Sequence, residues 1–224
     1  MVHLLTPFSR PQHLPQLLPM LAAQRIVWHP IVHDPQLLKL FRKRWIEPTF
    51  CGEVPQEQDP AYWKLNQWIT SQPIDDGELY GFFFDDAFYY PGFFDKLRKV
   101  GGSEWGVLFV TMHYKADTTF RAEPATVKTN SVGVLQCIVR GRVLRTMRFA
   151  NSPVADGMMA EWLKQTQNCI YRPELAVKIN CLKPGWWPAP PTPAPRHTPV
   201  RQYGNAILHS LRLLRSAVRR RVFG

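Results

Sequence analysis

The stretch Leu79-Tyr80-Gly81-Phe82-Phe83-Phe84-Asp85-Asp86-Ala87-Phe88-Tyr89-Tyr90-Pro91 begins as a run of large apolar and aromatic residues and then carries two adjacent carboxylates. Such a run, bounded by turn residues, is typical of a strand that is buried on both faces. In open α/β sheets, ligands bind at the carboxyl edge of the strands, which is where Asp85 and Asp86 would lie. Paired carboxylates there can hold a divalent cation or accept hydrogen bonds from a ribose. The alternative is a surface turn, in which Asp is common.

The composition indicates one large globular domain with an anionic partner. The chain has 224 residues, 45% of them hydrophobic and 12% aromatic, which excludes a disordered protein. The net charge of +11 favours a nucleotide, a nucleic acid or an acidic membrane surface as partner. The four cysteines have no CxxC spacing, so we expect free thiols in a reducing compartment.

The chain shows neither a leader nor a membrane span. Residues 1–5 lack a basic segment, and Pro7 comes too early for a signal peptide. No apolar run reaches the ~20 residues that a spanning helix needs. We therefore expect a cytoplasmic protein, and contact with the inner face of a membrane stays open.

The first 35 residues predict the start of a parallel sheet. An apolar strand over 2–5 is followed by the loop 6–11, a helix over 13–24 and a second strand over 26–32. The loop and Asp34 would both lie at the ligand edge of this sheet. Asp34-Pro35 can equally be the start of a turn.

The order of further segments predicts helices that alternate with strands. The basic residues of the helix over 36–45 are interpreted as a solvent-exposed face. Asp156 lies at the start of a late helix, where capping that helix is its alternative role. The expected elements are helices over 61–70, 92–100, 140–147 and 156–167, a strand over 105–113, a strand or strand–turn over 132–139, and an edge strand pair over 169–182.

The C-terminal part changes in character. Residues 188–200 form a Pro-rich linker, and residues 201–224 predict a basic amphipathic helix of the kind that binds anionic membrane surfaces. The alternatives are a helix packed on the domain or on a second subunit, or a nucleic-acid contact. Residues 1–187 are then the globular domain.

Several segments, taken in order, resemble the glycosyltransferase family 2 type of GT-A enzyme. The family has a strand ending in a T-P-x loop, a second strand ending in Asp, a Lys/Arg-x-Asn element, a strand ending in Asp residues and a late acidic motif. The corresponding segments are Leu5-Thr6-Pro7-Phe8-Ser9-Arg10, Ile31-Val32-His33-Asp34, Lys64-Leu65-Asn66, Phe84-Asp85-Asp86, Val132-Gly133-Val134-Leu135-Gln136 and Ala155-Asp156-Gly157. The resemblance covers residues 2–187 and implies an α/β fold, a single Rossmann-like GT-A domain whose central, mostly parallel sheet is flanked by helices.

The resemblance also implies an inverting transferase that uses a UDP- or GDP-type sugar and a glycan or lipid-linked acceptor. Asp156 would be the catalytic base. The donor would be bound by Thr6, Pro7, Arg10, Asp34, Asn66, Asp85 and Asp86, and the acceptor by Gly133, Gln136 and Trp186.

The metal site departs from the family pattern. The family often has Asp-x-Asp, whose last Asp coordinates Mn²⁺ or Mg²⁺, but Ala87 stands at that position if Asp85 is the first. Either Asp86 ligates the cation instead, or Arg and Lys side chains stabilise the leaving group.

Two other functions compete with the transferase. A non-catalytic nucleotide-sugar or glycan-binding protein on the same fold is favoured by Ala87. A nucleic-acid-binding protein is suggested by the charge of +11, but much of the excess charge lies in the tail, so we expect no specific nucleic acid partner.

Overall fold

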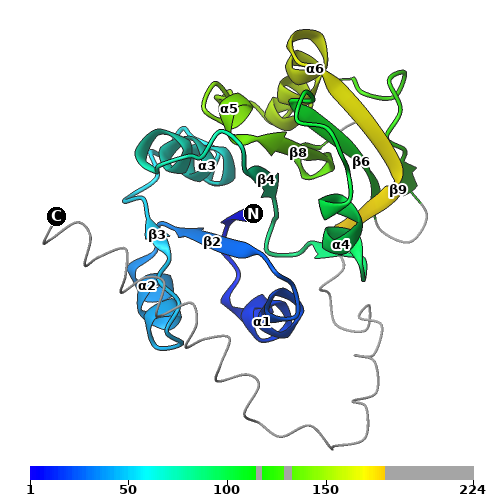
Figure 1. Ribbon diagram of the computed structural model, residues 1–224. Coiled ribbons are helices and arrows are strands. Elements are labelled where there is room, and N and C mark those ends of the chain that lie inside the picture. The colour runs from blue at the N-terminus through cyan, green and yellow to red at the C-terminus, as the bar shows by residue number, and fades with distance from the viewer. Residues whose placement is uncertain (115–117, 129–132, 180–224) are drawn as a thin grey trace, which may run out of the picture. The chain divides into compact units, whose positions relative to one another are not determined.

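The strand that leads to the two carboxylates lies inside a nine-stranded sheet in a computed structural model of the chain, which describes residues 1–114, 118–128 and 133–179 (Figure 1). The strand order is β3-β2-β1-β4-β8-β6-β9-β5, and β7 pairs with β6. The strands are β1 (Val2–Pro7), β2 (Val27–Val32), β3 (Thr49–Phe50), β4 (Leu79–Phe82), β5 (Phe88–Tyr89), β6 (Val107–Tyr114), β7 (Thr118–Phe120), β8 (Cys137–Arg140) and β9 (Cys169–Ile179).

Most of the described strands run in one direction. Strand β1 is parallel to β2 and β4, β2 is parallel to β3, and β6 is parallel to β9. Strand β8 is antiparallel to both of its neighbours, β4 and β6, which therefore share a direction. The predicted α/β class with a mostly parallel sheet is confirmed.

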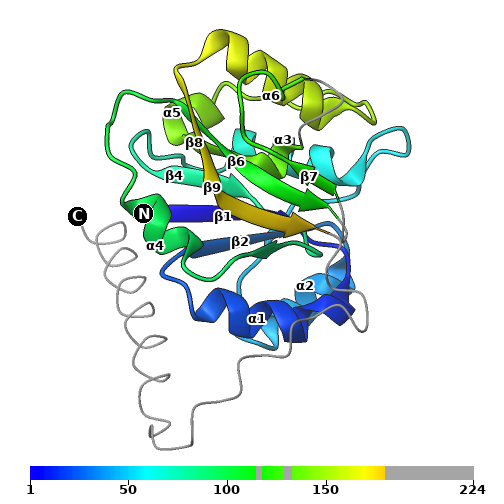
Figure 2. The ribbon, with the colours of Figure 1, turned by 90° about the vertical axis from the view of Figure 1, so that its right-hand side faces the viewer.

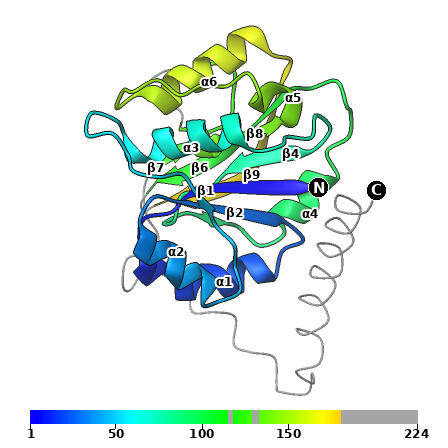
Figure 3. The same ribbon diagram turned by 90° about the vertical axis from the view of Figure 1, so that its left-hand side faces the viewer.

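Helices cover both faces of this sheet. Figures 2 and 3 show α1 (Leu14–Ala22) and α2 (Pro35–Arg42) on one side, and α3 (Pro60–Ser71), α5 (Gly141–Leu144) and α6 (Ala155–Thr166) on the other. A further helix, α4 (Phe93–Arg98), packs against β9, and short 3₁₀ turns are η1 (Pro11–His13) and η2 (Val134–Gln136). Because both faces are covered, the central strand β6 is buried over its first six residues.

The core on the α3 and α6 side is one continuous apolar cluster. Leu5, Ile31 and Phe82 contribute from three adjacent strands, and Leu65 of α3 and Leu163 of α6 close it. On the opposite side, Phe8, Leu14, Leu17 and Phe41 are fully buried. The two layers fix the carboxyl ends of β1, β2 and β4 relative to the helices that follow them.

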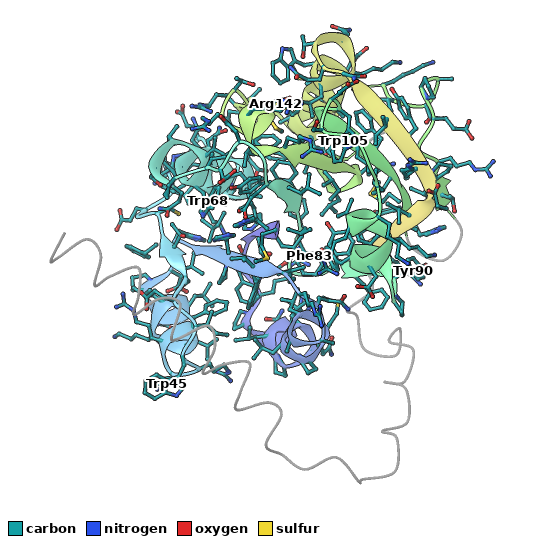
Figure 4. The ribbon with its side chains drawn as sticks, viewed as in Figure 1. Trp45, Trp68, Phe83, Tyr90, Trp105 and Arg142 are labelled. Carbon is teal, nitrogen blue, oxygen red and sulfur yellow. The ribbon has the colours of Figure 1, made fainter. Side chains whose placement is uncertain are left out.

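The segment around Asp85 and Asp86 is held by hydrogen bonds within the turn and from the strand that follows it. After β4 the backbone makes a β-turn over 84–87, closed by a hydrogen bond from the Ala87 N–H to the Phe84 carbonyl at 3.0 Å. The chain then returns as β5, where the Tyr89 hydroxyl donates to the Phe82 carbonyl at 3.0 Å. Phe83 points into the interior of the fold (Figure 4). The turn is therefore anchored at both ends by buried aromatic residues.

The C-terminal strand differs from the expectation. Instead of an edge strand pair over 169–182, residues 169–179 form one strand, β9, between β6 and β5. The register shifts between Val110 and Thr111, so that residues 173–175 bulge out of the ladder. Pro173, which has no N–H to donate, gave this bulge the sequence signature of a turn.

The remaining expectations fall partly outside the described residues. The predicted linker 188–200, the predicted helix 201–224 and Trp186 are all beyond residue 179. In the ranges that the structure does describe, helices fall short of the length and apolarity needed to cross a membrane.

Candidate functional site

The loop after β1 and the turn after β4 lie side by side at the carboxyl edge of the sheet. Leu5 is paired with Phe82, and the Phe83 N–H continues the ladder to the Leu5 carbonyl at 2.9 Å. The two chains then leave the sheet together, one into residues 6–10 and the other into the Asp doublet. This confirms that the doublet follows a strand at the carboxyl edge of the sheet, and the doublet also occupies a turn.

Asp85 is folded into the loop after β1. Its side chain is buried, and its Oδ2 accepts hydrogen bonds from the N–H groups of Ser9 at 2.7 Å and Arg10 at 2.8 Å. Its main-chain carbonyl accepts from His13 Nδ1 at 2.7 Å, which fixes the tautomer of that imidazole. Two successive N–H groups directed at one anion form a nest of the kind that also binds phosphate oxygens.

Arg10 joins the two carboxylates. Its Nη1 lies 2.6 Å from Asp86 Oδ2, and its Nε lies 3.5 Å from Asp85 Oδ1. Burial lowers the pKa of Arg10, but the bond to Asp86 and the charge of Asp85 outweigh it, so the pKa is raised and the guanidinium stays charged. The Arg10 side chain is 45% exposed while Asp86 is 11% exposed, so the cation faces solvent from above two buried anions.

Lys64 is a second cation in this cluster, and it is completely buried. It projects from α3, and its Nζ donates to the Phe8 carbonyl at 2.9 Å and to Ser9 Oγ at 2.7 Å. Burial lowers the pKa of Lys64 to about 8, although Cys51 and Asp85 act in the opposite direction. From the sequence, Lys64 was predicted only as part of the Lys64-Leu65-Asn66 motif. Its position beside Leu65 and Trp68 on an apolar helix could have indicated a buried cation that bonds the neighbouring loop.

The other residues at this edge that were predicted to bind the nucleotide sugar are buried or bonded within the protein. Thr6 is fully buried, and its Oγ1 accepts from Trp28 Nε1 at 2.8 Å. Pro7, the last residue of β1, is buried beside it. Asp34 is the N-cap of α2 and accepts from the Gln36 N–H at 2.7 Å, so it begins a helix and not the turn that was its alternative. Their contribution to nucleotide binding stays a prediction.

His33 was missed by the sequence analysis. It is the residue between β2 and Asp34, at the same edge of the sheet. Its Nδ1 is buried without a hydrogen-bond partner, which is uncommon for a buried polar atom. Burial and the nearby Lys64 lower the pKa of His33, so the neutral imidazole keeps a ring nitrogen that can bond a ligand.

Asn66 bonds the protein backbone through both ends of its side-chain amide. Its Nδ2 donates to the Phe149 carbonyl at 2.8 Å, and its Oδ1 accepts from the Phe149 N–H at 2.8 Å. This pair of bonds ties α3 to the segment before α6. The predicted contact of Asn66 with the donor stays untested, and the structure gives the residue a different role.

Asp156 lies in the first turn of α6 and is largely buried. Burial raises the pKa of its carboxyl group, while hydrogen bonds from Gly157, Val134 and Tyr62 act against that rise. Burial and the charge of Asp156 in turn raise the pKa of Tyr62. The position of a Cβ on Gly133 would be 3.2 Å from Asp156 Oδ2, so a side chain at residue 133 would crowd the carboxylate.

Of the predicted acceptor residues, Gly133 lies beside Asp156, whereas Gln136 lies inside the protein. Gln136 Nε2 donates to the carbonyls of Val110 at 3.0 Å and Phe120 at 3.1 Å, and its Oε1 accepts from the Gly133 N–H at 3.2 Å. Gln136 thus holds the segment that carries Gly133. The third predicted residue, Trp186, is not among the described residues.

Helix α3 connects the two halves of the site. Tyr62 contacts Asp156, and Lys64, two residues later on the same helix, contacts Ser9 beside Asp85. Figure 3 shows the first turns of α3 and α6 at the same end of the sheet as the carboxyl end of β1. The Thr6–Arg10 loop, Asp85 and Asp86 are therefore bonded together at one edge of the sheet, and Asp156 lies at the same end of the fold, with its hydrogen bonds to other residues.

The donor atoms at this edge do not fit a divalent cation. Within residues 1–114, 118–128 and 133–179 no group of three or more His, Cys, Asp or Glu side chains is placed to hold a metal ion. Asp85 is occupied by two N–H groups, Asp86 by Arg10, and Ala87 is buried with no ligating atom. Mg²⁺ is usually held by one or two carboxylates together with waters and substrate phosphates, but here both carboxylates already have protein partners.

Comparisons with known proteins do not show a family for this chain. No family model and no curated protein matches the sequence. Among solved structures, the crystal structure of A197 from STIV aligns with a TM-score of 0.40 and 10% identity over 79% of this chain and 83% of that chain. A likeness of this degree carries no argument about function.

Proposed function

We propose that this chain is a glycosyltransferase of the GT-A kind, which moves a sugar from a nucleotide-diphosphate donor to an acceptor hydroxyl with inversion. The observation that carries the proposal is the bonded unit of Ser9, Arg10, Asp85 and Asp86 at the carboxyl edge of parallel strands β1 and β4. Open α/β sheets bind nucleotides at this edge. The ordered motifs that resemble glycosyltransferase family 2 support the same reading.

The loop after β1 would receive the nucleoside diphosphate. Arg10 presents a permanently charged, half-exposed guanidinium there, and guanidinium groups bind phosphate oxygens in a bidentate manner. His33, with its unpartnered Nδ1, and Asp34 lie at the end of the neighbouring strand β2, where the base or ribose would be bound.

Asp156 would act as the general base. In a single displacement the acceptor oxygen bonds to the anomeric carbon, the bond from that carbon to the diphosphate oxygen breaks, and the acceptor proton passes to the Asp156 carboxylate. A base is most effective when its pKa lies near the working pH, and burial moves the pKa of Asp156 in that direction. The charge that develops on the diphosphate is offset by basic side chains.

A non-catalytic nucleotide-sugar or glycan-binding protein is the second candidate. The hydrogen bonds that Asp156 accepts from Gly157, Val134 and Tyr62 favour it, because they give the carboxylate a purely structural use. Ala87, in place of a metal-ligating carboxylate, points the same way.

Asp156→Asn separates the two functions. We expect the wild type to hydrolyse or transfer sugar from a UDP- or GDP-sugar, and the variant to lose about 100-fold or more in kcat, because proton transfer contributes about 10²–10⁴-fold to rate. Calorimetry should show donor affinity unchanged in the variant. Asp95→Asn, on the surface of α4, is the matched control.

The outcomes distinguish the candidates. Donor binding without turnover for any acceptor supports the binding protein. Absence of donor binding in the wild type contradicts both.

We further propose that the basic segment 201–224 contacts an anionic membrane surface. The segment contains six arginines, at 201, 212, 215, 219, 220 and 221, which equal more than half of the net charge of +11, and no acidic residue follows Glu174. Truncation after Trp187 should abolish co-sedimentation with phosphatidylserine vesicles, and salt should weaken binding of the full chain, since each basic residue contributes about 1 kcal/mol near such a surface. Unchanged vesicle binding after truncation contradicts the proposal, and tight binding of nucleic acid by the truncated chain favours a nucleic-acid function.

A further inference from the structure

Two side-chain cations lie at the carboxylate pair at the sheet edge, one in contact with it and one behind the loop that encloses it. Arg10 contacts both Asp85 and Asp86, and Lys64 reaches the backbone and hydroxyl of the loop that encloses Asp85. Burying two adjacent carboxylates without such partners would be costly. Two aspartates, one arginine and one protonated lysine have a formal charge of zero, which is also the charge of two aspartates with one divalent cation.

The two cations differ in what they can reach. Arg10 is 45% exposed. Its guanidinium has five N–H donors in a planar fork, and Nη1 and Nε are directed at Asp86 and Asp85, so the remaining donors can bind a phosphate while Arg10 stays on Asp86. Lys64 is fully buried, and its bonds to Phe8 and Ser9 fix the loop from which Arg10 projects. Arg10 is suited to contact the ligand, and Lys64 to position the loop.

A metal ion would have to dismantle this arrangement. At Asp86 Oδ2 it would compete with Arg10, which lies 2.6 Å away, and at Asp85 Oδ2 it would compete with the N–H groups of Ser9 and Arg10. At residue 87, a buried methyl group offers no third ligand.

We propose that Arg10 and Lys64 take the place of the divalent cation, so that this chain binds the diphosphate of its nucleotide without a metal ion. The inference rests on the proposed function for the identity of the ligand. The prediction about the carboxylates themselves, that they do not bind a divalent cation, can be tested without any nucleotide.

The first test uses Mn²⁺ alone with the full chain. The electron paramagnetic resonance signal of free Mn²⁺ should be as strong with wild-type protein as with Asp86→Asn, because the carboxylates are already paired. Mn²⁺ binding by the wild type that is lost in Asp86→Asn would overturn the inference. This readout holds whether or not the chain is a transferase.

The second test measures UDP and GDP binding by calorimetry, in EDTA and in Mn²⁺. We expect equal affinity in both buffers, and a loss of about 10–100-fold in Arg10→Gln, since hydrogen bonds to charged groups contribute about 1.5–3 kcal/mol. Arg44→Gln, an exposed arginine after α2, is the control and should bind as the wild type does. Affinity that requires Mn²⁺ overturns the inference and leaves the proposed function intact.

Lys64 is tested as a positioning residue with Lys64→Gln, whose folding is checked by its melting temperature. The variant leaves the cluster with an excess negative charge, so Mn²⁺ should now strengthen nucleotide binding, which a merely structural role would not cause. Metal-free affinity equal to that of the wild type would remove Lys64 from the inference. If the wild type binds neither UDP nor GDP in either buffer, the proposed function fails, and the Mn²⁺ measurement alone decides whether the carboxylates are closed to metal.

Discussion

Asn66 makes a residue-scale prediction that separates a structural role from a ligand contact. Asn66→Ala removes both hydrogen bonds between the side-chain amide of Asn66 on α3 and the backbone of Phe149. The N–H and the carbonyl of Phe149 must then find other partners. We expect the free energy of unfolding, measured with urea, to fall by about 1–3 kcal/mol. Gln67→Ala, the exposed neighbour on the same helix, is the control and should change little.

Calorimetry decides the predicted donor role of Asn66. If Asn66→Ala is less stable but binds UDP or GDP as the wild type does, the residue is structural. A variant of normal stability with weakened nucleotide affinity would instead support the role that the family resemblance implies.

Single residues were predictable where their partners are local. The pair Asp85-Asp86 follows directly from an apolar strand, and Asp34 precedes a helix whose Gln36 N–H it accepts. Lys64 and Asn66 acquire their roles from groups 55 and 83 residues away, and no local pattern records those distances. The spacing of apolar residues predicts that Lys64 and Asn66 share a helix, but it does not predict which groups their side chains contact.

At the scale of elements, the motif that ends α2 contains a residue, Trp45, whose side chain disfavours the left-handed backbone conformation that it adopts there. The Ile46 N–H bonds to the Phe41 carbonyl at 3.2 Å and the Trp45 N–H to the Arg42 carbonyl at 3.0 Å, which is a Schellman motif. Trp45 occupies its left-handed position, with φ of 59°, where glycine is favoured. Its side chain is 95% exposed and lies at the outer end of α2 (Figure 4).

Trp45→Gly should therefore stabilise the protein. The substitution removes the left-handed penalty and loses almost no burial, so we expect a gain of about 1 kcal/mol in the free energy of unfolding. Trp45→Ala, which keeps a Cβ, is the matched control and should not gain. Destabilisation by Trp45→Gly would mean that the indole contributes to folding in spite of its exposure.

The elements themselves were predictable when their signals lay within one segment. Apolar spacing placed α1, α2, α3 and α6 to within a few residues, because each buries one face. The strands β5 and β7 were missed, since they are two and three residues long and depend on pairing with β9 and β6. The bulge at Pro173 likewise made one strand resemble two.

At the scale of the whole molecule, the two edges of the sheet are chemically different. The carboxyl edge holds the cluster of Asp85, Asp86, Arg10 and Lys64, whereas the amino edge holds His3, His29 and Glu78. The parallel order of β2, β1 and β4 creates this division, because all three strands begin at one edge and end at the other. The sequence could place single residues at strand ends, but the insertion of antiparallel β8 between β4 and β6 depends on contacts between distant segments.

The amino edge predicts how global stability depends on pH. His3 Nδ1 lies 2.8 Å from His29 Nε2, and His3 Nε2 bonds to Glu78, so a neutral chain runs from His29 through His3 to the carboxylate. Burial, followed by the adjacent His3, lowers the pKa of His29 to about 4, and burial also lowers the pKa of His3. Between these values and the ordinary value near 6.5, the unfolded chain binds more protons than the folded chain.

Stability should consequently be complete above about pH 6.5 and fall as the pH drops toward 4, with His29 accounting for up to about 3 kcal/mol. Urea unfolding at a series of pH values measures this slope. His29→Gln cannot take up the proton, so its stability should be lower at pH 7.5, where a bond to His3 is disturbed, yet decline less on acidification. His113→Gln, on β6, is the control and should keep the wild-type slope. An equal slope in His29→Gln and wild type would show that the amino edge is not the source of acid sensitivity, and would move attention to the carboxylates of the opposite edge.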